Sequence, residues 1–165
     1  MNIKIWVLPI LLLILVLAGL FWYRRYQQSL PENYQEIGPI DQLVIEGVIF
    51  DIEIAVTAQE RAKGLSGRSQ LCDQCGMLFV FPQEDYHSFW MKDTLIPLDI
   101  VWLDKNWRVV DYLVWAQPQG VRKLTDLPTY QPKKPAQFVI EFPGGTVKRI
   151  RNFNIGSQIT TKQQN

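Results

Sequence analysis

Hydrophobic residues are concentrated in one long run close to the amino terminus. The segment from Ile5 to Tyr23 holds 19 residues without a charge. As an α-helix it would span roughly 28 Å, close to the hydrocarbon thickness of about 30 Å in a bilayer. Trp6, Trp22 and Tyr23 stand at its two ends, where aromatic rings favour the headgroup region. The run predicts one transmembrane helix within residues 1–25 that anchors the chain in a lipid bilayer.

A cleaved signal peptide is the alternative interpretation of the same run. Val16-Leu17-Ala18 is a poor small-x-small cleavage site, and the apolar residues continue past it. Charge does not settle the orientation, because Lys4 and the α-amine flank one end while Arg24 and Arg25 flank the other. The short leading tail favours an extracytoplasmic domain, and the reverse orientation stays open.

After the apolar run the pattern becomes polar and then alternating. Residues 26–42 are rich in Gln, Asn and Pro and show no apolar periodicity, which predicts a tether. From Leu43 to Val56, apolar residues alternate with polar or small ones around Gly47, as they do in β-strands. The globular part is therefore expected over residues 43–162.

A short helix and several further strands follow. Thr57 and Glu60 have the spacing of a capping box, which predicts a helix of about two turns that Gly64 or Gly67 closes. The remaining strands are expected at Met77–Phe81 (stopped by Pro82), Ser88–Met91, Leu98–Leu103, Trp107–Trp115, Gln137–Phe142 and residues 158–161.

The connections complete the predicted fold class. Asp104-Lys105-Asn106 predicts a hairpin turn, Gln117–Pro135 a long surface loop, and Gly144-Gly145 the start of a helical turn. The result is a mainly β (α+β) domain: a small barrel-like antiparallel sheet with one or two short helices, preceded by one transmembrane helix.

Composition narrows the classes of function. The formal net charge is +1, and the part of the chain from residue 26 carries 14 basic and 16 acidic residues, which argues against nucleic-acid binding. A single histidine excludes His-rich metal sites and any catalytic pair of histidines. Since no phosphate loop, dinucleotide fingerprint or nucleophile elbow is present, no cofactor, metal or catalytic residue is predicted.

Several motifs make the chain resemble the family called domain of unknown function 192. They extend over about residues 43–160, and the run from Phe89 to Asp99 is the most specific of them. Position 66 usually holds Met and position 93 Asn in that pattern, where this chain has Ser66 and Asp93. The resemblance implies a compact β-rich fold that is often exported or membrane-anchored, and it implies no reaction. The matching residues are Gly64-Leu65, Arg68, Leu71, Gly76–Phe81, Ser88–Ile100, Ala136–Glu141, Gly144-Gly145 and Ile155-Gly156.

Cys72 and Cys75 are the first candidate for chemistry. Outside the cytoplasm such a pair can form a structural disulfide. A redox-active dithiol, half of a zinc site with His87, and two inert thiols are the alternatives.

A second candidate is the segment that contains Trp90, Lys92, Asp93 and Thr94. In a strand, Phe89 and Met91 are expected to share one face, with Trp90 and Lys92 on the other. A bend that presents Lys, Asp and Thr beside an exposed Trp would suit a ligand. The alternative is a connection whose Asp and Thr bond their own backbone.

The third candidate is a polar set of Arg68, Asp99 and Glu141. Arg68 could pair with either carboxylate as an ordinary ion pair. If Asp99 and Glu141 converge, they could act as acid and base or hold a cation. Of the tryptophans at 90, 102, 107 and 115, most are expected in the core and one or two at the surface.

Three functional hypotheses follow. The preferred one is a membrane-tethered binding module for an envelope ligand or a protein partner. The second is an envelope hydrolase that uses Asp99 and Glu141. The third is a structural or assembly factor that docks to another membrane protein.

Overall fold

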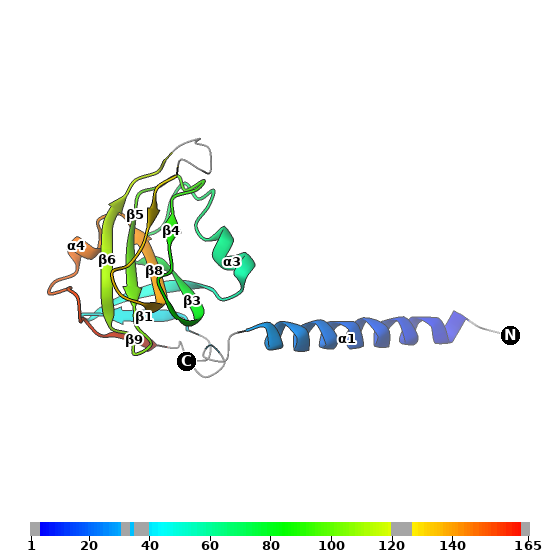
Figure 1. Cartoon of the computed structure of the whole chain (residues 1–165). Helices are drawn as coiled ribbons and strands as arrows, with labels where there is room; N and C mark the ends of the chain where they lie inside the picture. The colour runs from blue at the N-terminus through cyan, green and yellow to red at the C-terminus, as the bar shows by residue number, and fades with distance from the viewer. Residues whose placement is uncertain (1–3, 31–33, 35–39, 120–126, 163–165) are drawn as a thin grey trace.

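The structure is a computed structural model that describes residues 4–30, 34, 40–119 and 127–162. The long helix α1 (Lys4–Ser29) extends away from a β domain built from all the other elements (Figure 1). The first strands are β1 (Gln42–Ile45), β2 (Val48–Ala55) and β3 (Cys75–Asp85), with α3 (Ala58–Lys63) between the last two. The later elements are β4 (Phe89–Trp90), β5 (Leu98–Leu103), β6 (Val109–Ala116), β7 (Thr129–Tyr130), β8 (Ala136–Pro143), α4 (Thr146–Arg149) and β9 (Ile159–Lys162).

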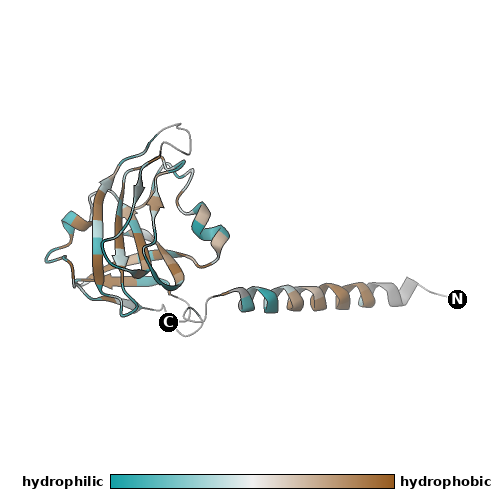
Figure 2. Cartoon of the chain, in the orientation of Figure 1, coloured by the Kyte–Doolittle hydropathy of each residue, from teal (hydrophilic) through white to brown (hydrophobic). Residues whose placement is uncertain are grey.

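Helix α1 bears out the expected apolar helix, and it continues to Ser29. Its window Pro9–Tyr26 is long and apolar enough to cross a membrane, and none of it is buried against the rest of the chain. Figure 2 shows the helix brown over most of its length and teal where it approaches the β domain. It is an apolar helix that could insert into a membrane or serve as a signal sequence. Residues 26–29 of the expected tether belong to this helix, while residues 31–33 and 35–39 and the side chain of Trp6 lie outside the described part of the chain.

Seven strands form one curved sheet in the order β6-β5-β8-β3-β2-β1-β9. The two edges approach each other where Arg108 pairs with Gln158 and the N–H of Ile159 donates to the carbonyl of Trp107 at 2.9 Å. The sheet is thus a half-barrel, as the sequence predicted. One pair departs from the antiparallel expectation, because β2 and β3 run parallel. The chain crosses between them through α3 and a loop, and a crossover of that kind permits a parallel pair.

Local chemistry explains several boundaries. Glu46 and Gly47 have φ values of 48° and 82°, which suit the tight turn between β1 and β2. The predicted capping box is present: the N–H of Glu60 donates to the Thr57 hydroxyl at 3.2 Å, and the Glu60 carboxylate accepts from the N–H of Thr57 at 2.8 Å. Gly64, at φ 46°, ends the helix.

Two expected boundaries were wrong. Strand β3 does not stop at Pro82 but runs on to Asp85, because a register shift between Val80 and Asp85 accommodates a residue that has no N–H to donate. The expected loop Gln117–Pro135 contains β7, which pairs with β4 in a separate two-stranded sheet. A two-residue strand is too short to produce a periodic pattern.

Two apolar clusters lie on the two faces of the large sheet. One includes Phe50, Val101, Phe138 and Phe142 and fills the half-barrel. The other includes Phe79, Phe89, Ile100 and Trp102. Leu65, Phe89 and Met91 join the second cluster from the α3 loop and the β4 segment, so these segments cover its face. Figure 1 shows α3 and α4 on opposite sides of the β domain.

Asp99 joins β5 to β6 and α4. It is fully buried, and its carboxylate accepts hydrogen bonds from the N–H groups of Trp115, Gly145 and Val147 at 2.9, 2.9 and 2.8 Å. Hydrogen bonds to a buried carboxylate are stronger than those between neutral groups. The side chain therefore holds the turn after β8 against the end of β6.

Asp99→Asn should destabilise the domain by about 2–4 kcal/mol, because the amide leaves at least one buried N–H without an acceptor. The free energy of unfolding from urea titration measures this cost. Asp93→Asn is the matched control, since Asp93 is exposed at φ 52° and asparagine tolerates that conformation. Equal stability of the two variants would contradict the role assigned to Asp99.

Candidate functional site

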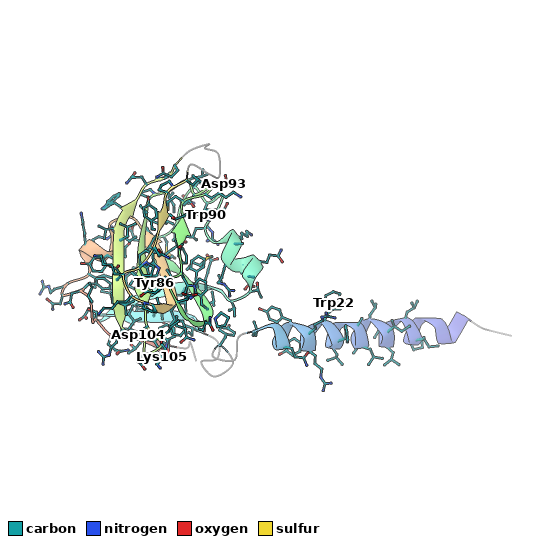
Figure 3. All side chains as sticks on the ribbon, in the orientation of Figure 1. Trp22, Tyr86, Trp90, Asp93, Asp104 and Lys105 are labelled. Carbon is teal, nitrogen blue, oxygen red and sulfur yellow. A yellow bond between two sulfur atoms is a disulfide. The ribbon has the colours of Figure 1, made fainter. Side chains whose placement is uncertain are left out.

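A pocket of about 250 Å³ lies between the α3 side of the domain and the β4 segment. Helix α3 and the loop after it form one wall. The opposite wall comes from β4 and the loop that follows it, and β3 and β8 supply the floor. In Figure 3, Trp90 and Asp93 mark this end of the domain near α3, whereas Asp104 and Lys105 lie toward the other end. The lining residues are Arg61–Ser66, Phe79, Phe81, Ser88–Trp90, Lys92, Thr94 and Glu141.

Glu141 on β8 is the buried acid of this pocket. Only 4% of the residue is exposed, and its cross-strand neighbours are Met77 on β3 and Ile100 on β5, both apolar. No hydrogen bond or ion pair between the described residues involves its carboxyl group. Burial raises the pKa of Glu141 to about 8, so the folded protein holds it neutral at lower pH. A neutral carboxyl group can both donate and accept a hydrogen bond.

The other charged residues that line the pocket are cations. Lys63 and Lys92 are exposed and stand on opposite walls. Arg61 is half-buried, and its guanidinium donates to the carbonyls of Val56 and Val80 and lies 4.9 Å from the centre of the Phe81 ring. Below pH 8 the pocket therefore has a neutral acid inside and positive charge around it.

The loop after β4 is fastened to the loop after α3. The N–H of Gly67 donates to the carbonyl of Asp93 at 2.8 Å. Within the turn, the Thr94 hydroxyl donates to the carbonyl of Lys92 at 3.3 Å. The N–H of Thr94 donates to the carbonyl of Met91, also at 3.3 Å. These bonds hold both walls of the pocket at a fixed separation.

The structure resolves the expectations for this segment. Phe89 and Met91 are buried, while Trp90 and Lys92 are exposed, which confirms the predicted alternation. Trp90, Lys92 and Thr94 line the pocket, and Asp93 does not. Asp93 adopts the left-handed conformation that both Asn and Asp tolerate, so this departure from the family pattern keeps the backbone turn.

Aromatic rings surround the inner part of the pocket. Phe79 and Phe89 meet edge to face at 5.0 Å, and His87 stacks on Phe81 at 3.5 Å. Trp90 and Trp115 are 45% and 46% exposed, in line with the expectation of one or two surface tryptophans. Trp102 is in the core, with its indole N–H donating to the carbonyl of His87 at 3.0 Å.

Asp99 and Glu141 do not form a carboxylate pair. In the register of β5 and β8, Asp99 lies opposite Phe142, and Glu141 lies opposite Ile100. Residues directly opposite each other share a face of the sheet, and successive residues alternate. Asp99 therefore points into the half-barrel and Glu141 to the covered outer face. The condition for the acid–base or cation hypothesis, that the two carboxyl groups converge, is therefore not met.

Arg68 forms an ion pair with neither Asp99 nor Glu141. It pairs bidentately with Glu53 on β2, with both N–O distances at 2.5 Å, and both side chains are partly exposed. The hydrogen bond and the charge of each partner lower the pKa of Glu53 and raise that of Arg68. Arg68 therefore makes a surface ion pair beside the pocket and does not line it.

Cys72, in the loop before β3, forms a disulfide with Cys75, the first residue of that strand, and their Cα atoms are 5.1 Å apart. His87 lies elsewhere: besides stacking on Phe81, its Nε2 is 3.1 Å from the carbonyl oxygen of Gln83. Across the described ranges, no group of three or more metal-ligating side chains is present. The structure gives no support to a zinc site built from these residues.

Sequence reasoning missed the contribution of α3 and of β3 to the pocket. It named Trp90, Lys92, Thr94 and Glu141 but not Lys63, Ser66 or the phenylalanines at 79 and 81. The capping box predicted helix α3 itself. Because α3 has no buried residue, its sequence has no apolar periodicity that would indicate which side of the helix lines the pocket.

The comparisons with known proteins agree with the resemblance. Residues 42–161 match the sequence family DUF192, described as "Uncharacterized ACR". The UPF0127 protein TK1120 of Thermococcus kodakarensis is 31% identical over 104 residues. That match covers 60% of this chain and 57% of the relative, so it spans little more than half of the relative's length.

Two solved structures share the fold. A protein of unknown function from Novosphingobium aromaticivorans is 31% identical with a TM-score of 0.66, over 73% of this chain and 84% of its own. A protein from Sinorhizobium meliloti, described as a "putative transcription regulator", is 26% identical with a TM-score of 0.64, over 73% of this chain and 90% of its own.

The buried acid makes the stability of the domain depend on pH. Glu141 loses its proton near pH 4.5 in the unfolded chain and near pH 8 in the folded protein, so stability falls as the pH rises between these values. Glu141→Gln removes this titration. The variant should match the wild type near pH 4.5 and exceed its free energy of unfolding by about 2–4 kcal/mol above pH 8.

Urea unfolding at a series of pH values measures the difference. Glu46→Gln is the control, because Glu46 is exposed in the turn between β1 and β2 and should show no such trend. A constant difference between Glu141→Gln and the wild type at all pH values would contradict the burial effect.

Proposed function

Because the chain belongs to the DUF192 family of uncharacterised proteins, we propose its function from its own geometry: the β domain is a binding module for a small polar ligand. The observation that carries this proposal is Glu141, a buried carboxyl group without a hydrogen-bond or ion-pair partner among the described residues, which lines the same pocket as Trp90 and Lys92. Helix α1 would hold the module at a membrane surface.

Burial of the Glu141 carboxyl group lowers the stability of the fold, which indicates that this side chain has a functional role. A buried polar group without a hydrogen-bond partner costs about 1–3 kcal/mol. Val139, two residues earlier on the same face of β8, is a buried member of the outer apolar cluster, so Glu141 places an acid on a face that is otherwise apolar along this strand. A ligand that bonds to Glu141 would remove the cost on binding, which accounts for an acid at this position.

Binding is favoured over hydrolysis by what the pocket contains. A paired-carboxylate mechanism needs a second acid in the same pocket, so that the two carboxyl groups flank the bond that is cut. Glu141 is the one acid among the residues that line the pocket, and Asp99 is on the other face of the sheet. For nucleic acid, the 14 basic and 16 acidic residues after residue 25 supply no excess of positive charge.

Two features support an extracytoplasmic position for the module. The window Pro9–Tyr26 of α1 has the length and composition of a membrane span. The Cys72–Cys75 disulfide fits an oxidising compartment, since cytosolic thiols are kept reduced in most organisms. An uncleaved α1 with its amino terminus inside the cell would place the β domain outside.

Two tryptophans of equal exposure provide the test of binding. Trp90 lines the pocket, and Trp115 does not. In the full chain in detergent, a ligand found by screening small polar compounds should change the indole fluorescence of wild type and of Trp115→Phe. The same ligand should give little change with Trp90→Phe. A screen in which no compound affects Trp90 would contradict the proposal.

The state of the cysteines tests the location. Cells lysed in an alkylating reagent should yield protein whose Cys72 and Cys75 are unmodified until reductant is added, as measured by mass spectrometry. Protein expressed without residues 1–25, and so kept in the cytoplasm, is the control and should be alkylated at both positions. Two freely alkylated cysteines in the full chain would contradict an extracytoplasmic domain.

A further inference from the structure

We propose that the ligand of the pocket is a hydroxylated ring of monosaccharide size that carries one negative charge, such as a sugar acid or a sugar phosphate. This inference rests on the proposed binding function and specifies the chemistry of its ligand. It is argued from the size of the pocket, from the distribution of charge around it, and from the polar and aromatic groups inside it.

The size of the pocket limits the ligand. Sites for drug-sized molecules enclose about 300–1,000 Å³. The volume here is about 250 Å³, so the occupant is smaller than those molecules, at the scale of a single sugar ring. Only one end of a longer ligand could enter the pocket.

The charges select an anion. Lys63, at the end of α3, and Lys92, in the loop after β4, both line the pocket and are exposed, so each brings a positive charge to its lining from a different segment of the chain. Arg61 adds a third positive charge. Glu60, the acid next to Arg61, is turned back to the N–H groups of Val56 and Thr57. A positively charged ligand would meet repulsion at the opening and would find no carboxylate inside below pH 8.

The inner part of the pocket suits hydroxyl groups. The neutral carboxyl of Glu141 can donate one hydrogen bond and accept others. The Thr94 hydroxyl is nearly buried, and because it donates to the carbonyl of Lys92 its oxygen is free to accept. Ser66 and Ser88 add hydroxyls on the two walls. A sugar can satisfy several such groups at once, whereas an aromatic acid of the same size can satisfy only those near its carboxylate.

Trp90 supplies the surface for the ring. Its side chain is 45% exposed at the edge of the pocket, although Phe79, Phe81 and Phe89 already provide apolar packing below it. An indole presents a large rigid face at a small conformational cost, and the C–H face of a sugar can pack on it. These contacts define one orientation of the ligand. Its ring packs on Trp90 at the edge of the pocket, its hydroxyl groups bond to the polar groups inside, and its anionic group faces the two lysines.

The test compares four sugars of similar size by calorimetry with the full chain in detergent, at low salt and at a pH well below the pKa of Glu141. D-glucuronate and D-glucose 6-phosphate carry an anion, D-glucose is neutral, and D-glucosamine is a cation. At least one anion should bind roughly tenfold more tightly than D-glucose, and D-glucosamine most weakly. The two anions distinguish a carboxylate from a phosphate.

Two double lysine variants test whether the preference for an anionic sugar arises from the lysines that line the pocket. Lys63→Gln with Lys92→Gln should lower the affinity for the anionic sugar roughly tenfold and lower the affinity for D-glucose much less. Lys105→Gln with Lys148→Gln removes the same charge from exposed positions outside the pocket and should leave both affinities unchanged.

Three results would overturn the inference: D-glucosamine binding as tightly as the anions, equal effects of the two double variants, or no binding of either anion. These failures are distinguishable from failure of the binding function itself. If the binding function itself is wrong, the fluorescence of Trp90 will respond to no compound of any charge. If Trp90 responds but the response does not depend on ligand charge, the domain is still a binding module and only the anionic sugar is ruled out as its ligand.

Discussion

The register between β5 and β8 is the constraint from which both faces of the domain follow. It sets Asp99 opposite Phe142 and Ile100 opposite Glu141, so two acids on adjacent strands point to opposite sides of one sheet. A shift of a single residue would reverse both side chains. The fixed register therefore allows two buried acids in one sheet to serve different purposes.

The two acids show how surroundings decide the role of a carboxyl group. Asp99 is fully buried but receives three backbone N–H groups from β6 and from the turn that begins α4. It joins elements and has nothing left to offer a ligand. Glu141 is similarly enclosed, has apolar cross-strand neighbours and receives no N–H from the described part of the chain, and burial raises its pKa to about 8. A similar side chain thus becomes a neutral group that a ligand can reach.

The pocket depends on segments that cover the outer face of the sheet. The hydrogen bond from Gly67 to Asp93 links the loop after α3 to the loop after β4, and the capping box of Thr57 and Glu60 fixes where α3 begins. The arrangement places Lys63 and Lys92 on facing walls above the same floor. In this way a half-barrel with a filled interior has its candidate pocket outside the barrel.

The sequence by itself determined the features that depend on neighbouring residues: the apolar helix, the alternation in β1 and β2, the capping box, and the buried and exposed sides of the segment at 89–92. It also singled out Glu141, Trp90, Lys92 and Thr94 without showing that they meet. Only the tertiary structure decided that β2 and β3 run parallel, that Arg68 pairs with Glu53, and that Asp99 and Glu141 lie on opposite faces. The physical reason is that periodicity and capping are local along the chain, whereas strand order and register are set by packing between residues that lie far apart in sequence.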